Sequence, residues 1–186
     1  RDDDVLVQCE CTANSFTVNH PDTTCMIDVQ NITKRYGNLT AIDRVTFSVA
    51  KGEVLAFLGP NGAGKTTTMR ILTCFMPATE GTAKVAGFDC ADQPLEVKRR
   101  IGYLPETPPV YQEFTVAEYL TFVGRMRGMV GKNLTTALDQ SIEKLALGSV
   151  RHRLIGNLSR GYRQRVGLAQ AVLHDPPVLI LDEPTV

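Results

Sequence analysis

Apolar and polar residues alternate along two stretches in the first half of the chain, residues 26–33 and residues 45–49. Alternation with a period of two is typical of strands that bury one face, and the residues "RYGN" (35–38) between them are typical of a turn. Residues 52–59 instead form an apolar run that ends in glycine. Such a run indicates a strand buried on both faces, so we expect two half-buried strands followed by one fully buried strand.

The rest of the chain carries helix and strand patterns in alternation. Residues 65–76 have apolar residues at helical spacing, and we expect Pro77 to end that helix. We then expect a strand at 81–87, a short helix at 94–100 that begins with proline, a strand at 101–104, helices at 115–127 (capped by Thr115) and 134–146, a helix from Ser159 to Leu173 and a buried strand at 177–184. This order predicts an α/β fold with a mostly parallel sheet, in which ligands bind at the carboxyl ends of strands.

The first 25 residues lack any such pattern, because they are polar and irregular and periodic apolar sequence begins at Met26. We expect Met26 to be the natural start of the domain and residues 1–25 to be a disordered extension outside it. A native N-terminal arm is the alternative that composition leaves open.

Composition narrows the class of protein. The 186 residues suffice for one domain, and 20 Lys and Arg residues balance 20 Asp and Glu residues, so no global positive charge favours nucleic acid. No apolar run approaches the roughly 18 to 20 residues that a membrane span requires, and the acidic start does not resemble a signal peptide. The five cysteines include no C-x-x-C pair, and Cys9-x-Cys11 has no second ligand pair at zinc spacing. These features favour a reducing cytoplasm over a secreted disulfide scaffold.

The motif "GPNGAGKT" (59–66) satisfies the P-loop pattern G-x-x-x-x-G-K-[ST] between a predicted strand and a predicted helix. Glycines in such a loop let backbone N–H groups converge on phosphate oxygens, and the helix N-terminus adds its positive end. We expect Lys65 to reach the β- and γ-phosphates and the Thr66 hydroxyl to bind Mg²⁺. A glycine-rich turn with an exposed lysine is the alternative. The expected nucleotide contacts are Gly59, Pro60, Asn61, Gly62, Ala63, Gly64, Lys65, Thr66 and Thr67.

Two neighbouring carboxylates, Asp182 and Glu183, follow the buried strand at the far end of the chain. Such a pair is difficult to explain structurally, because an unpaired buried carboxylate is costly. We expect Asp182 to hold Mg²⁺ and Glu183 to accept a proton from an attacking water. A helix-capping aspartate is the alternative, which the following Pro184 disfavours. Together with the P-loop, the pair predicts a Mg²⁺-dependent nucleoside triphosphatase with Lys65 and Glu183 as catalytic residues.

A further motif, "LSRGYRQR" (158–165), stands just upstream of "LILDEPT" (179–185). The order of strand, P-loop, helical insertion, Leu-Ser-x-Gly loop and Asp-Glu-Pro-Thr resembles the nucleotide-binding subunit of ATP-binding cassette (ABC) transporters, over about residues 26–186. In that family, a Leu-Ser-Gly-Gly-Gln signature opens a helix and binds the γ-phosphate of ATP held by a second subunit.

The resemblance implies this phosphate-binding role for Ser159 and Gly161. Arg160 and Tyr162 depart from the family's glycine and glutamine, so affinity and partner contacts are expected to change more than binding itself. The alternative for this stretch is an arginine-rich, solvated helix start.

Two further positions match the family. Tyr36 falls where the family places an aromatic that stacks on adenine, with a tyrosine that packs on its own sheet as the alternative. Glu106 in "IGYLPETPPVY" (101–111) stands where the family has the glutamine of its Q-loop, and its carboxylate can still meet Mg²⁺.

The resemblance also implies architecture and partners. It implies a P-loop NTPase fold with a mostly parallel central sheet, an N-terminal antiparallel β portion and a helical subdomain at about 107–172. It implies MgATP hydrolysis by a head-to-tail dimer that docks on integral membrane permease subunits at the cytoplasmic face of the membrane. "YLPE" and "LSRGYRQR" look most like the export-type cassettes of the gliding-motility and multidrug group. We therefore expect ATP and Mg²⁺ as cofactors, export as the coupled process and no nucleic acid as a partner.

The chain stops at "PTV", where the family continues into a D-loop and a switch histidine. We therefore expect a C-terminally truncated cassette and weak or absent hydrolysis by residues 1–186 alone. Two other functions stay open. A soluble ABC ATPase that acts on ribosomes or DNA would bind nucleic acid in a salt-dependent manner, and a non-hydrolytic, nucleotide-dependent regulator would dimerise without turnover.

Overall fold

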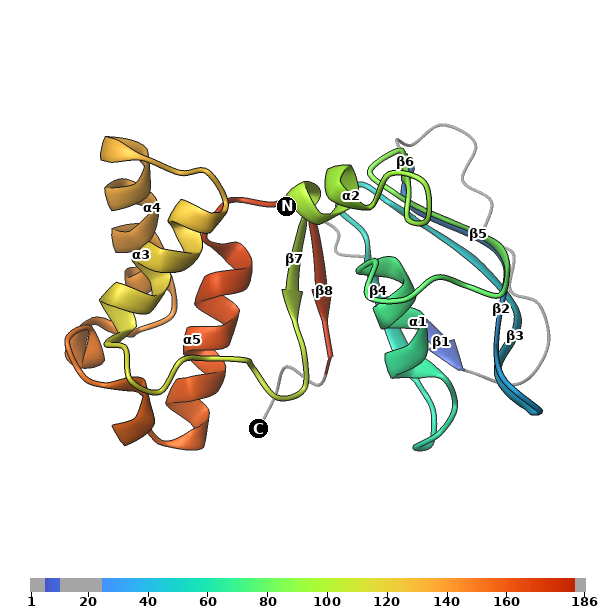
Figure 1. The fold of residues 1–186 in the computed structure, drawn as a ribbon, viewed down its shortest axis with the longest axis horizontal. Helices are drawn as coiled ribbons and strands as arrows, with labels where there is room; N and C mark the ends of the chain where they lie inside the picture. The colour runs from blue at the N-terminus through green and yellow to red at the C-terminus, as the bar shows by residue number, and fades with distance from the viewer. Residues whose placement is uncertain (1–5, 11–24, 183–186) are drawn as a thin grey trace. The chain divides into compact units, whose positions relative to one another are not determined.

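The computed structural model of the chain describes residues 6–10 and 25–182. It consists of two compact units, Arg1–Arg100 and Ile101–Val186, each of which is described by itself (Figure 1). The first unit holds an antiparallel sheet, a parallel strand pair and the P-loop helix, whereas the second holds another parallel strand pair with a group of helices. Within the described ranges, no helix combines the length and apolar character needed to cross a membrane.

The antiparallel sheet of the first unit has the strand order β3–β2–β5–β6. β2 (Cys25–Tyr36) and β3 (Leu39–Ala50) pair around a tight turn, so the two predicted half-buried strands are confirmed and are longer than predicted. β5 (Glu80–Val85) pairs with β2, and β6 (Phe88–Asp89) pairs with β5. This arrangement is the antiparallel β portion that the sequence predicts.

β4 (Val54–Leu58) runs parallel to β1 (Leu6–Glu10). β1 lies inside residues 1–25, the stretch for which the sequence predicts a disordered extension outside the domain. The other residues up to position 24 lie outside the described residues. A strand at this place is unexpected from sequence because its five residues carry no period-two pattern long enough to be distinguished from an irregular segment.

The prediction that β4 is fully buried is wrong. Val54 is 52% exposed and Leu58 is 42% exposed, and only intermediate burial is reached between them. The ring of Phe57 packs edge-on against Phe47 of β3, with the ring centroids 5.1 Å apart. Among the described residues β4 hydrogen-bonds to β1 alone, so the ends of the strand keep contact with water.

α1 (Lys65–Leu72) begins where the sequence predicts and ends earlier. Its end is a Schellman motif, in which the Cys74 N–H donates to Ile71 O at 3.0 Å and the Phe75 N–H donates to Arg70 O at 2.9 Å. Cys74 adopts a left-handed conformation (φ 56°) at the position that glycine ordinarily occupies. This backbone reversal, and not the later proline, ends the helix.

α2 (Pro94–Arg100) has proline at its first position, as predicted. Glu96 accepts hydrogen bonds from the guanidinium groups of Arg99 and Arg100, each at 2.6 Å. The Arg100 guanidinium also lies 4.0 Å from the centroid of the Phe88 ring, which connects the helix to β6.

In the second unit, β7 (Ile101–Leu104) and β8 (Val178–Leu181) pair in parallel, which confirms both predicted strands. α5 (Arg160–Val172) lies beside this pair (Figure 1). The helix segment approaches β7 closely at Gly102, where an added Cβ would lie 2.2 Å from the Ala171 carbonyl oxygen. A side chain at this position would therefore push α5 away from the strands.

α3 (Val116–Met126) and α4 (Gly131–Lys144) lie on the side of α5 away from the strand pair (Figure 1). The predicted N-cap Thr115 is confirmed and forms a capping box with Glu118. α4 begins earlier than predicted. Its first turn is exposed and carries no apolar residue at the core face until Leu134, so the apolar pattern does not reveal the start of the helix.

Two short 3₁₀ turns, η1 (Gly148–Val150) and η2 (Ile155–Asn157), join α4 to α5. A buried apolar cluster holds the helices of the second unit together. Its members are Val116, Tyr119, Leu120, Leu138, Ile142, Leu147, Val150, Ile155, Leu158, Val166, Ala169 and Leu173.

Candidate nucleotide site

The P-loop connects β4 to α1, so it leaves the carboxyl end of a strand and enters a helix, as predicted. Gly62 (φ 88°) and Gly64 (φ 86°) are both left-handed, a conformation that favours glycine. An added Cβ at Gly64 would lie 2.7 Å from the Ala41 carbonyl oxygen. The tight course of the loop therefore depends on glycine at position 64 for both backbone conformation and space.

Lys65 folds back across the loop. Its Nζ donates to Gly59 O at 2.7 Å and to Pro60 O at 3.0 Å, which holds the ammonium group over the turn. No side chain caps the helix at Gly64, and the first turn of α1 contains no acidic residue. The first N–H groups of a helix have no intrahelical acceptor, so this end combines unpaired donors with a cation and suits an anion.

Tyr36, at the end of β2, has an accessible ring that is 46% exposed. Its hydroxyl hydrogen-bonds to Met76 Sδ at 3.0 Å, and Lys34 Nζ lies 5.5 Å from the ring centroid. Lys34 itself donates to Pro77 O at 2.7 Å. The tyrosine is thus held by its hydroxyl at the rim of the sheet and is not packed into it, which suits stacking on a flat ligand.

Asp182 and Glu106 follow neighbouring strands of the second unit. Leu104 of β7 pairs with Leu181 of β8, and the Asp182 N–H donates to Leu104 O at 2.8 Å. Both residues therefore follow the same end of the strand pair, with Asp182 5% exposed and Glu106 in the exposed class. Glu183 lies outside the described residues. Among residues 6–10 and 25–182, no three His, Cys, Asp or Glu side chains gather as a metal cluster.

Ser159 caps α5, and its hydroxyl accepts a hydrogen bond from the Tyr162 N–H at 3.4 Å. Gly161 is exposed, and an added Cβ there would have nothing within 4 Å. Arg163 donates to Leu158 O at 2.6 Å, and the Arg165 guanidinium lies 5.3 Å from the Tyr162 ring centroid. Two of the three arginines of this motif therefore make contacts within the segment, while Gly161 in the first turn of the helix is exposed.

The sequence does not predict a polar bridge that contacts the chain on both sides of Glu106. Gln170 of α5 donates to Tyr103 O at 3.2 Å, and its Oε1 lies 3.3 Å from the hydroxyl of Tyr119, which also lies 3.4 Å from Pro109 O. Burial raises the pKa of Tyr119 to about 12, so its hydroxyl remains a donor at neutral pH. The bridge joins the strand, two helices and the segment after Glu106. No local sequence pattern predicts this bridge, because its residues are far apart in the sequence.

Gly167 of α5 makes a second contact with the same segment. An added Cβ would lie 2.5 Å from Pro108 Cβ, so the helix and the chain after Glu106 are in direct contact at this point.

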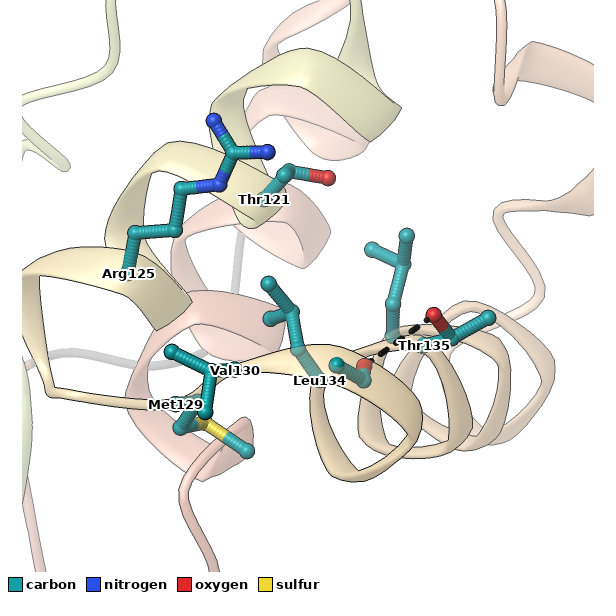
Figure 2. Close-up of a pocket in the computed structure, with 8 residues that line it drawn as sticks. Thr121, Arg125, Met129, Val130, Leu134 and Thr135 are labelled. Carbon is teal, nitrogen blue, oxygen red and sulfur yellow. Dashed lines mark hydrogen bonds between the residues drawn. The ribbon is translucent and has the colours of Figure 1, made fainter.

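A hollow of about 440 Å³ lies between α3 and α4, lined in part by Thr121, Arg125, Met129, Val130, Leu134 and Thr135 (Figure 2). It contains none of the predicted site residues.

The family model described as "ABC transporter" matches residues 42–186. The chain is 42% identical over 159 residues to an uncharacterised ABC transporter ATP-binding protein, YxlF of Bacillus subtilis, with 86% of this chain and 52% of that protein covered. It is 37% identical over 161 residues to the SkfA peptide export ATP-binding protein SkfE of Bacillus subtilis, with 87% and 66% covered. The chain thus spans about half to two thirds of the length of these relatives.

A solved structure described as the ATP-binding subunit of an ABC transporter matches the fold with a TM-score of 0.80 and 30% identity, over 87% of this chain and 67% of that one. The chain belongs to the ABC transporter family, as an ATP-binding domain of the P-loop NTPase fold.

Proposed function

We propose that the chain binds the phosphates of ATP at residues 59–67. The observation that carries the proposal is the loop itself, with left-handed Gly62 and Gly64, an uncapped helix N-terminus and Lys65 folded across the loop carbonyls. Phosphate oxygens would accept hydrogen bonds from the free N–H groups and from the ammonium group. Tyr36 would stack on the adenine base, an interaction worth about 1–3 kcal/mol per base.

We also propose that Mg²⁺ would be held by the Thr66 hydroxyl, Asp182 and Glu106, because each offers an oxygen ligand. Mg²⁺ is usually bound by one or two carboxylates together with substrate phosphates and waters. The burial of Asp182 supports a cationic partner, because a buried carboxylate without one is costly. When bound, Mg²⁺ would neutralise charge on the β- and γ-phosphate oxygens.

Hydrolysis follows from the same groups. Glu183, adjacent to Asp182, would accept the proton of the attacking water, and Lys65 would stabilise negative charge on the γ-phosphate. Because the chemistry consists of positioning and charge stabilisation, both groups must be present for turnover.

We infer further that two copies act head to tail, each presenting Ser159 and Gly161 to the ATP bound by the other. The first turn of α5 supports this role, because it is exposed, contains no acidic residue and has open space at Gly161. Arg163 and Arg165 are engaged within their own segment, so the helix N-terminus and the Ser159 hydroxyl would provide the phosphate contacts.

We propose that ATP hydrolysis by the dimer drives substrate export through separate membrane permease subunits, which the dimer contacts at the cytoplasmic face of the membrane. Membership of the ABC transporter family supports coupling to transport. The name of SkfE, a peptide export protein that is similar to this chain, supports the direction.

The variant Lys65→Ala tests the nucleotide site, with Lys132→Ala as a matched control on an exposed helix surface of the second unit. Hydrogen bonds to charged groups contribute about 1.5–3 kcal/mol, so Lys65→Ala should raise the Kd for MgATP by roughly 10- to 150-fold. Isothermal titration calorimetry should find the control unchanged. Equal affinities of both variants for MgATP would contradict the proposed site.

A further inference from the structure

The segment that follows α1 is joined to the end of β2 by hydrogen bonds. The Thr79 N–H donates to Thr33 O at 2.8 Å, and the Arg35 N–H donates to Thr79 Oγ1 at 3.1 Å. The Arg35 guanidinium also forms an ion pair with Glu80. None of these contacts involves the side chain of Tyr36, so they fix the segment beside this residue independently of its ring.

Two side chains from these elements hold the ring of Tyr36. Its hydroxyl hydrogen-bonds to Met76 Sδ at 3.0 Å, and Lys34 Nζ lies over the ring at 5.5 Å from the centroid. Lys34 is partly buried, and its Nζ donates to Pro77 O at 2.7 Å. The ammonium group is thus anchored to the backbone. Contacts at the hydroxyl and over one face restrict how the ring can turn.

The arrangement leaves the Tyr36 ring with one open face. A cation attracted to the negative face of an aromatic ring occupies that face, so a flat ligand can stack only on the other one. With the residue 46% exposed, area remains for such a ligand. A side chain held in place before binding loses less conformational freedom when the ligand binds, which increases affinity.

We propose that Lys34 and Met76 are positioning residues for the nucleotide base, because together they fix the Tyr36 ring as a stacking platform with one open face. The inference rests on the proposed ATP site and adds the side chains that orient its aromatic ring. Neither of them touches the nucleotide in this proposal. Because α1 begins in the P-loop and leads to Met76, one helix would connect the phosphate end of the site with its base end.

The experiment measures the Kd for ATP and for inorganic triphosphate by isothermal titration calorimetry, with the whole chain and Mg²⁺. Lys34→Met removes the charge and keeps an unbranched stem, and Met76→Leu removes the sulfur acceptor at nearly constant volume. The two substitutions are combined in a double variant. Lys84→Met is the matched control, an exposed lysine of β5 in the same sheet. The double variant is also made in a Tyr36→Ala background.

We expect the double variant to raise the Kd for ATP by about 3- to 10-fold, because a cation–π contact and a hydrogen bond no longer hold the ring. The Kd for triphosphate, which has no base, should stay unchanged, and the Lys84→Met control should be unchanged for both ligands. In the Tyr36→Ala background, the same two substitutions should have no further effect on ATP binding, because no ring remains to be positioned.

Three results would overturn the inference. If Tyr36→Ala weakens ATP binding and the double variant does not, the stacking stands and the positioning role is refuted. If the double variant weakens ATP and triphosphate in parallel, or weakens ATP further in the Tyr36→Ala background, Lys34 acts on the nucleotide directly. If Tyr36→Ala leaves ATP binding unchanged, there is no stacking to support. Failure of the phosphate site itself has a different signature, because Lys65→Ala would then bind triphosphate as tightly as the wild type.

Discussion

Gly167 and Gly161 lie in the same helix, α5, and their replacement by alanine should change stability in opposite directions. At Gly167 an added Cβ would lie 2.5 Å and 2.6 Å from two ring atoms of Pro108, and 2.9 Å from Leu104 Cδ1. The proline ring cannot rotate away, so the helix or the segment must shift, and overpacking of this kind costs about 1–3 kcal/mol. The helix propensity of alanine over glycine offsets about 1 kcal/mol. We expect Gly167→Ala to lose up to about 2 kcal/mol in net stability relative to the wild type, and to be about 1–3 kcal/mol less stable than a variant that gains the same propensity without the clash.

Gly161→Ala is the matched control, because an added Cβ there meets nothing within 4 Å. Only the propensity gain remains, so this variant should be as stable as the wild type or more stable by up to about 1 kcal/mol.

Urea denaturation followed by tyrosine fluorescence reads the relevant part of the molecule. Tyr103, Tyr111, Tyr119 and Tyr162 lie in the second unit, whereas only Tyr36 of the five tyrosines lies in the first. The transition midpoints should rank Gly161→Ala at or above wild type and Gly167→Ala below it, with equal m-values. A Gly167→Ala midpoint equal to that of Gly161→Ala would refute the contact between α5 and Pro108.

Three other predictions concern single side chains, those of Tyr119, Thr115 and Tyr36. Burial raises the pKa of Tyr119 to about 12 from the ordinary 10.0, so between these pH values the unfolded chain loses a proton that the folded chain keeps, and stability falls as pH rises. Tyr119→Phe should therefore show a smaller loss of urea midpoint over this range than the wild type, and an identical loss would refute the assignment. Thr115→Ala should lose about 1 kcal/mol through its α3 cap while Thr115→Ser keeps it; equal urea midpoints for the two would speak against the cap. Tyr36→Ala should weaken ATP binding by about 1–3 kcal/mol without changing the affinity for inorganic triphosphate, which has no base, and a parallel loss for both ligands would exclude stacking.

The sequence predicts elements well where a local pattern and a local stop signal coincide. The strands at 101–104 and 178–181, the cap at Thr115 and the start of α2 at Pro94 are of this kind. The end of α1 is predicted wrongly because Cys74 adopts a left-handed conformation that is ordinarily taken by glycine. The burial of β4 is overestimated because a continuous apolar run does not reveal how many faces its neighbours cover.

The candidate site also has parts that the sequence predicts and parts that it does not. The P-loop and the Ser159 cap depend on consecutive residues, so sequence alone indicates their geometry. The bridge through Gln170 and Tyr119 joins residues that are distant in the chain, and its hydrogen bonds depend on how α3, α5 and β7 pack. Helix packing of this kind has no local signature, which is why the sequence missed it.

In the proposed dimer, Ser159 and Gly161 complete an ATP site formed by Lys65 of another copy. Mixing two disabled variants tests it, both in a Glu183→Gln background that should prevent turnover. One carries Lys65→Ala, and the other carries Gly161→Asp, which places a carboxylate where phosphate would bind. In native mass spectrometry with MgATP, we predict that neither variant dimerises alone and that the mixture forms a heterodimer with one bound ATP. A mixture that stays monomeric, while the Glu183→Gln protein itself dimerises with ATP, would contradict the claim.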